Sequence, residues 1–245
     1  MEKSINIFEN IDDLSTFFAR QLIKRIQNIP EGQFFSMALS GGSTPKAVFQ
    51  SLALNFGNQI AWGKIRIFWG DERCVAPENK ESNYRMAKES LLDQVPIPVN
   101  NIFRIKGEAN PSYEADRYAK VVSQHVSSQN NIPQFDFMML GLGDDGHTAS
   151  IFPGNLRLFS SDKLFEVAEH PQTKQKRITA TGKLINQALT VAFLASGDSK
   201  SAMVSTVLDR KKEWEKLPAS LVHPKNGELF WLLDEKAASK TQKFR

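Results

Sequence analysis

The feature that most constrains the fold is the alternation of short apolar runs with longer segments of helical periodicity along the chain. The predicted strands are 34–40, 64–70, 101–105, 135–141, 177–181, 189–195 and 229–234. The predicted helices are 45–54, 83–95, 112–128 and 199–214. Near-continuous apolar strands separated by amphipathic helices are typical of a mostly parallel sheet covered on both faces. The sequence therefore predicts a doubly wound, Rossmann-like α/β fold with three layers.

The length of 245 residues suits one large α/β domain or two small ones. No fixed-period repeat and no linker rich in proline, glycine or serine divides the chain, so we expect a single domain over 1–245. Hydrophobic residues make up 41% and charged residues 24%, as in an ordinary soluble globular protein. The lone cysteine, Cys74, excludes a disulfide framework and favours a reducing compartment. We interpret it as a small buried residue.

The charge and the N-terminal sequence limit location and partners. Acidic residues stand where a signal peptide needs a basic and then apolar stretch, and no apolar run approaches transmembrane length. We therefore expect a cytoplasmic protein that does not bind membranes. The net charge of +4 comes from scattered basic residues, and the mixed cluster 209–216 predicts a solvated helix face. Nucleic-acid binding would need a concentrated basic stripe. A small anionic substrate or a bland basic surface fits equally well, and we expect a monomer.

The first strand-to-helix turn, residues 39–45, has the features of a phosphate site. Ligands of doubly wound folds bind at the carboxyl ends of the strands. Gly41 and Gly42 allow close backbone approach, and Ser43 or Thr44 is predicted to cap a helix that begins at the following proline. Free N–H groups at a helix N-terminus suit an anion. The spacing matches neither a Walker loop nor a nucleophile elbow, and an ordinary capped helix is the alternative.

The turn 141–146 is a formal match to the G-x-G-x-x-G dinucleotide fingerprint. However, Asp144 and Asp145 would face the pyrophosphate, with a repulsion on the order of 4 kcal/mol per pair at about 4 Å. The turn also follows three predicted strands, whereas a dinucleotide loop is expected at the first. We therefore predict no dinucleotide binding. The turn instead delivers Asp145, His147 and Thr148 to the sheet edge, where His147 could take a proton from water while Asp145 fixes its tautomer. A capping or core histidine is the alternative.

Three cations lie near the ends of predicted strands. Arg73 follows 64–70, Arg177 begins 177–181, and Lys200 follows 189–195 through a glycine. Arg177 and Lys200 could close on a phosphate held by the first turn, because guanidinium and ammonium groups are common phosphate partners. Taken singly, each is more simply a surface cation. The remaining histidines have no partner at metal-ligand spacing, so no metal site is predicted.

Together these stretches resemble the 6-phosphogluconolactonase family of the pentose phosphate pathway. The segments LSGGSTP, WGDER, SNYRMA, GLGDDGHTASIFPG, RIT and LPASLVHP occur in the family's order and span most of the chain. The related glucosamine-6-phosphate deaminases and isomerases typically have Asp-Glu-Tyr in the second turn and Asn-Glu-Pro-Gly after the histidine. This chain has Asp-Glu-Arg and Ser-Ile-Phe-Pro-Gly there, so the resemblance to the lactonases is closer. The chain departs from the lactonase pattern at two positions. Asn79 stands where many lactonases have histidine, and Gly182 stands where the Arg-x-Thr segment often continues toward a proline.

The resemblance implies a hydrolase that opens 6-phospho-D-glucono-1,5-lactone to 6-phosphogluconate without a metal or cofactor. It implies that His147 is the base, with Asp145 orienting it, and that Arg73 or backbone N–H groups stabilise the oxyanion. Arg73 could serve the phosphate instead. The other residues implied to hold the phosphate are Gly41, Gly42, Ser43, Thr44, Arg177 and Lys200. Two alternatives stay open: an amino-sugar-phosphate isomerase or deaminase on the same fold, and a non-catalytic phosphosugar sensor. Such sensors usually carry a helix-turn-helix, for which this chain has no room.

Overall fold

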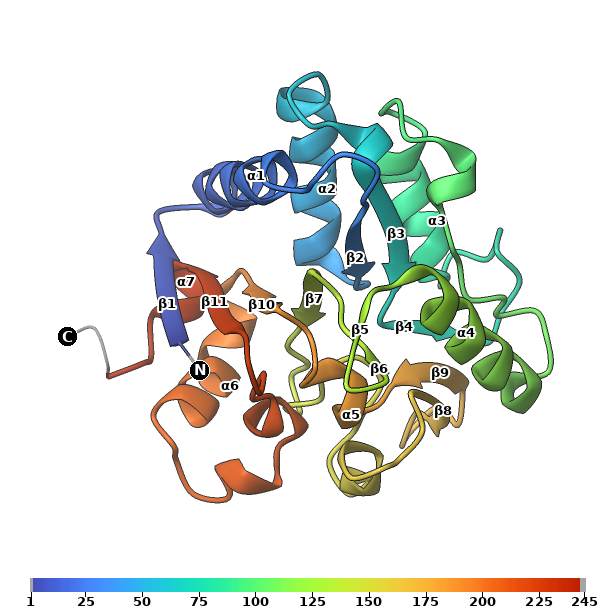
Figure 1. Cartoon of the computed structure of the whole chain (residues 1–245). Helices are drawn as coiled ribbons and strands as arrows, with labels where there is room; N and C mark the ends of the chain where they lie inside the picture. The colour runs from blue at the N-terminus through green and yellow to red at the C-terminus, as the bar shows by residue number, and fades with distance from the viewer. Residues whose placement is uncertain (1, 243–245) are drawn as a thin grey trace.

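The computed structural model describes residues 2–242 and is built around a six-stranded sheet (Figure 1). Every neighbouring pair of strands in this sheet is parallel. In spatial order the strands are β1 (Glu2–Phe8), β11 (Glu228–Asp234), β10 (Thr190–Ala195), β7 (Phe137–Gly141), β2 (Phe35–Leu39) and β3 (Ile65–Trp69). Both β2 and β10 are buried along their whole length, which explains why their sequences are mostly apolar. The predicted doubly wound fold is confirmed.

Helices enclose the sheet. In Figure 1, α1 (Ile11–Gln27) and α2 (Ser43–Phe56) lie together on one side, and α5 (Gly182–Ile185) and α6 (Ser201–Leu208) lie on the other. The side chain of Asn10 starts α1 by accepting hydrogen bonds from two N–H groups of its first turn. The remaining helical elements are α3 (Asn83–Ala87), which continues as a π-helical turn (Lys88–Leu92), α4 (Pro111–His125) and α7 (Glu235–Ala238).

A second, antiparallel sheet lies next to the parallel one. It contains β4 (Asp71–Arg73), β9 (Lys176–Ala180) and β8 (Phe165–Glu169). Segment 177–181 is therefore a strand, as predicted, but it does not belong to the parallel sheet. A short hairpin of β5 (Ser128–Gln129) and β6 (Ile132–Pro133) lies elsewhere.

The predicted strand 101–105 is wrong. Ile102 makes one isolated bridge with Ile67 at the edge of the main sheet. The ladder does not continue, because the next carbonyl, that of Phe103, accepts a hydrogen bond from the buried Tyr118 hydroxyl. A side chain of α4 thus occupies the backbone group that a further strand pair would need.

The helix predicted over 199–214 ends early, at Leu208. Arg210 and Glu213 both have positive φ, at 53° and 66°, which a right-handed helix does not allow. The solvated helix face predicted for 209–216 is therefore wrong, and this segment is a turn followed by a 3-10 helix. At the other end of the chain, β1 and α1 were not predicted.

The connectivity of the sheet places the functional edge. From β2 the chain runs outward to β3, and it later returns to β7 on the other side of β2. Ligands bind at such a switch point, beyond the carboxyl ends of the strands. The backbone N–H of Gly70 bonds to the carbonyl of Leu39, and the N–H of Ala180 bonds to the carbonyl of Gly70. These bonds attach the small sheet to the same edge.

Candidate active site

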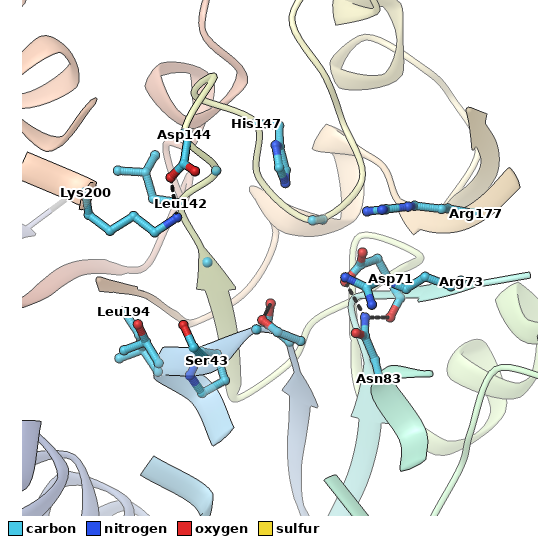
Figure 2. Close-up of a pocket in the computed structure, with 18 residues that line it drawn as sticks. Ser43, Asp71, Arg73, Asn83, Leu142, Asp144, His147, Arg177, Leu194 and Lys200 are labelled. Carbon is cyan, nitrogen blue, oxygen red and sulfur yellow. Dashed lines mark hydrogen bonds and ion pairs between the residues drawn. The ribbon is translucent and has the colours of Figure 1, made fainter. Parts of the chain in front are cut away.

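A pocket of about 210 Å³ opens at this edge of the sheet (Figure 2). The turns that follow β2, β7 and β10 form it together with β4 and β9. Every residue predicted for the site lines this pocket except Asp145, which is bonded to His147, and Thr148, which is buried and donates its hydroxyl to the Gly141 carbonyl. The lining residues are Ser40, Gly41, Gly42, Ser43, Thr44, Pro45, Asp71, Arg73, Asn83, Gly141, Leu142, Gly143, Asp144, His147, Ala149, Arg177, Leu194 and Lys200.

The glycine loop after β2 presents the N-terminus of α2 to the pocket. Gly42 is the capping residue, with φ of 110°, and neither Ser43 nor Thr44 makes a side-chain cap. The predicted cap is therefore wrong, and the cap lies one or two residues earlier, because only glycine adopts this backbone angle without strain. The side chain of Asn83 lies so close to Gly41 that an added Cβ would fall 1.9 Å from its Oδ1. The loop therefore leaves the first N–H groups of α2 without a side-chain partner and accessible to an anion.

The turn after β7 fixes the tautomer and position of His147. The carboxylate oxygen Oδ1 of Asp145 lies 2.6 Å from Nδ1 and also accepts the backbone N–H of His147 at 3.0 Å. Nδ1 therefore carries the proton, and Nε2 is left as an acceptor. Partial burial acts to raise the pKa of Asp145, but its bonds to His147 hold that pKa below its ordinary value. A Cβ on Gly143 would lie 2.1 Å from Nδ1. The glycines of the apparent fingerprint thus make room for an imidazole.

Two arginines face each other across the small sheet. Arg73 of β4 pairs directly with Arg177 of β9, and both line the pocket. Among the described residues, neither buried Nε atom has a hydrogen-bond partner. Burial, and then the charge of Arg73, lower the pKa of Arg177. Two like charges held together by a backbone ladder favour an anionic ligand, which would offset their repulsion.

Lys200 approaches the pocket from a different side. Figure 2 shows Lys200 and Asp144 at one end and the two arginines at the other, with His147 between. The ammonium group lies 2.6 Å from a carboxylate oxygen of Asp144. The predicted cations therefore share one pocket, but Arg177 lies opposite Arg73 rather than beside Lys200.

A buried polar network, not predicted from the sequence, supports the arginine side of the pocket. Asp71 accepts hydrogen bonds from the Ser150 hydroxyl at 2.6 Å and from the Asn83 amide at 3.2 Å. Ser150 is also within 3.5 Å of an Arg177 nitrogen. All but Arg177 are at most 4% exposed. Asp71 stood next to the predicted Arg73, and Asn83 lay in one of the family segments, but neither position alone indicated a contact.

The lone cysteine, Cys74, does not line the pocket. Cys74 is half-buried, and burial followed by the charge of Glu72 raises the pKa of its thiol to about 11. A protonated thiol is a poor nucleophile.

Among residues 2–242, no group of three or more His, Cys, Asp or Glu side chains could hold a metal ion. Within the same range, no helix is both long and apolar enough to span a bilayer.

The two departures from the lactonase pattern lie away from the pocket lining. Asn79 accepts the backbone N–H of Glu81 at 2.9 Å in an exposed turn. Gly182 begins α5, where an added Cβ would come within 2.5 Å of the Phe159 carbonyl oxygen. Glycine is therefore required by local packing at this position.

The parallel sheet, the switch-point pocket and the glycine turn that holds His147 define a class of protein. The protein-family model described as "Glucosamine-6-phosphate isomerases/6-phosphogluconolactonase" matches residues 9–231, and the chain belongs to this family. The 6-phosphogluconolactonase of Aggregatibacter actinomycetemcomitans is 39% identical over 203 residues, covering 82% of this chain and 85% of that protein.

Two solved structures extend this similarity. The structure of the devB protein has a TM-score of 0.91 at 37% identity, covering 97% of this chain and 99% of that one. The 6-phosphogluconolactonase of Trypanosoma brucei has a TM-score of 0.84 at 31% identity, covering 97% and 98%. The family resemblance predicted from the sequence is confirmed.

Proposed function

We propose that the protein hydrolyses 6-phospho-D-glucono-1,5-lactone to 6-phosphogluconate, in the oxidative branch of the pentose phosphate pathway. The observation that carries this proposal is that His147, oriented by Asp145, lines one pocket with three cations and a helix N-terminus. Such a pocket provides a base for water and positive charge for a phosphorylated substrate. The similarity to curated 6-phosphogluconolactonases over most of the chain supports the same activity.

The base in this mechanism is Nε2 of His147. Because Nδ1 bonds to Asp145, Nε2 accepts a proton from water as the water oxygen attacks the lactone carbonyl carbon. The carbonyl electron pair moves onto oxygen, and the tetrahedral intermediate then collapses with cleavage of the bond to the ring oxygen. The imidazolium returns its proton to that departing oxygen, giving the open-chain acid. Asp145 stabilises the imidazolium throughout and is not itself protonated.

The phosphate and the oxyanion require separate positive groups. We assign the phosphate to the backbone of Gly41 and Gly42, to Ser43 and Thr44 at the start of α2, and to Lys200. Arg73 is assigned to the developing oxyanion or to the phosphate, and Arg177 to the phosphate. The two possible roles of Arg73 differ in their kinetic effect. Loss of a phosphate contact raises KM, whereas loss of an oxyanion contact lowers kcat.

We further propose that residues 1–245 act as one domain and as a monomer in the cytoplasm, with no cofactor. The buried hydrophobic residues of both halves of the chain form one cluster, as expected of a single domain. The lone cysteine supports a reducing compartment.

The decisive experiment measures lactone hydrolysis by the purified protein, corrected for spontaneous opening of the lactone. A rate above background is expected, and it should be lost in His147→Ala. Absence of catalysis would overturn the proposal. Two parallel assays identify the alternatives: release of ammonia from glucosamine 6-phosphate indicates the deaminase, and ligand binding with zero turnover of either substrate indicates a sensor.

A further inference from the structure

Lys200, one of the cations assigned to the phosphate, already has an anionic partner. Its ammonium lies 2.6 Å from Oδ1 of Asp144, and both residues line the pocket. The two side chains differ in exposure: 22% for Lys200 and 75% for Asp144. In Figure 2, the Lys200 side chain extends toward Asp144 along the wall of the pocket. The carboxylate therefore stands where an anionic ligand of Lys200 would bind.

The adjacent carboxylate provides a comparison. Asp145 accepts two hydrogen bonds from His147 and is thereby fixed. Within the described structure, the Asp144 carboxylate is bonded to Lys200 alone. Exposed ion pairs are worth only about 0–1 kcal/mol, so an incoming phosphate can displace this one. Asp144 is thus held by a single weak contact that competes with the substrate.

We propose that Asp144 sets the affinity of the site for phosphate by occupying Lys200 until a phosphorylated ligand displaces it. This inference rests on the proposed function, because it takes Lys200 as a phosphate contact. The pair opens when the substrate binds and re-forms as the product leaves. The phosphate makes and breaks no bond in the reaction, so the competition weakens binding of substrate and product alike. It therefore affects KM and the product dissociation constant rather than the chemical step.

The test is the dissociation constant of inorganic phosphate for wild type and Asp144→Asn, by calorimetry at low salt. Removing the competing carboxylate should tighten phosphate binding by about two- to fivefold. The same factor is expected in the dissociation constant of 6-phosphogluconate. The matched control is Asp198→Asn, which removes an exposed acid from the turn of Lys200 itself. It should change either constant by less than about twofold, since no ion pair joins Asp198 to Lys200 in the described structure.

A second pair of variants tests whether Asp144 acts through Lys200. In a Lys200→Met background, Asp144→Asn should give no gain in phosphate affinity. Unchanged or weaker phosphate binding in the single variant Asp144→Asn overturns the inference, since weaker binding means that Asp144 positions Lys200. An equal gain in Asp198→Asn also overturns it, as a general charge effect. Tighter phosphate binding without lactone hydrolysis by wild type would remove the proposed function alone, whereas hydrolysis without tighter binding would remove this inference alone.

Discussion

At the scale of single residues, three features of the structure position the His147 ring. Asp145 bonds to Nδ1, the absence of a side chain at Gly143 leaves space for the ring, and Phe152 packs against it with ring centroids 4.7 Å apart. The first two contacts lie within one turn and follow from the glycine-rich sequence around the histidine. The third depends on the fold of the segment beyond the turn.

Replacing His147 with alanine removes the proposed base. We expect kcat to fall by roughly 10²–10⁴-fold, the usual contribution of general-base catalysis. The dissociation constant of 6-phosphogluconate should stay near the wild-type value, because the glycine loop and the cations are unchanged. The matched control is His170→Ala, since His170 packs on Phe152 but does not line the pocket. Retention of most of the wild-type kcat in His147→Ala would show that another group activates the water.

Asp145→Asn tests the orienting carboxylate through the pH dependence of kcat/KM. Only a neutral imidazole accepts a proton, so kcat/KM should rise with pH and then level off. Because the pKa of Asp145 is held below its ordinary value, its carboxylate is ionised throughout this range. Asparagine removes the negative charge that stabilises the imidazolium. The rising limb should therefore move to lower pH, and the plateau should fall. A limb displaced to higher pH would contradict this role.

Phe152 is predicted to position both the catalytic base, His147, and the phosphate-binding Arg177. Phe152 is 2% exposed, yet it is not part of the main hydrophobic cluster. Its neighbours are instead His147 and Arg177, with the guanidinium 5.5 Å from the ring centre. Phe152→Leu should lower kcat and raise KM together, while Phe152→Tyr should restore much of both. A change in thermal stability with unaltered kinetic constants would indicate a packing role only.

At the scale of elements, α3 depends on one buried carboxyl group. Glu72 is 2% exposed and accepts backbone N–H groups of Arg73, Asn83 and Tyr84 at 2.7–2.8 Å, as well as the Ser82 hydroxyl. Burial raises the pKa of Glu72, and these four hydrogen bonds act against the rise. This group therefore joins β4 to the start of α3, which carries Asn83 into the pocket.

Glu72→Gln should destabilise the protein, because the glutamine amide places a donor against backbone donors. Leaving one such buried group unpaired costs about 1–3 kcal/mol, which corresponds to a fall in Tm of about 2–10 °C. The control Glu81→Gln, in the exposed turn nearby, should leave Tm almost unchanged. The measurement is thermal unfolding followed by circular dichroism. Equal effects of the two substitutions would show that Glu72 has no special part in holding α3.

The elements also show how far the sequence could predict this structure. Buried strands such as β10 were predictable because an apolar segment between turns has few alternatives. The second sheet that contains 177–181 was not predictable, because its partner β4 has three residues and no strand pattern. The same holds for the site: Asp145 and His147 share a turn and were predicted. Asp71, Asn83 and Ser150 meet only through tertiary contacts, so local patterns could not reveal them.

At the scale of the whole molecule, the pocket joins turns from most of the chain's length. Only the native arrangement binds ligand, so binding should stabilise the whole protein. At 100 times its dissociation constant, 6-phosphogluconate should add about 2.7 kcal/mol and raise Tm by about 5–10 °C. Gluconate, which lacks the phosphate, is the control and should shift Tm little at the same concentration. Equal shifts with the two ligands would show that the phosphate contacts are not those proposed.

The pairing of β1 with β11 has a consequence for how the protein is made. The first strand described lies at the edge of the sheet, and its partner there is the last strand described. The ribosome must therefore synthesise β11 before β1 can pair with it. Until then, Ile5 and Ile7 remain on an unpaired strand. Such segments are targets for aggregation and for chaperones. A nascent chain stalled just after Lys200 would contain every lining residue of the pocket and still lack β11, the strand that joins β1 to the rest of the sheet.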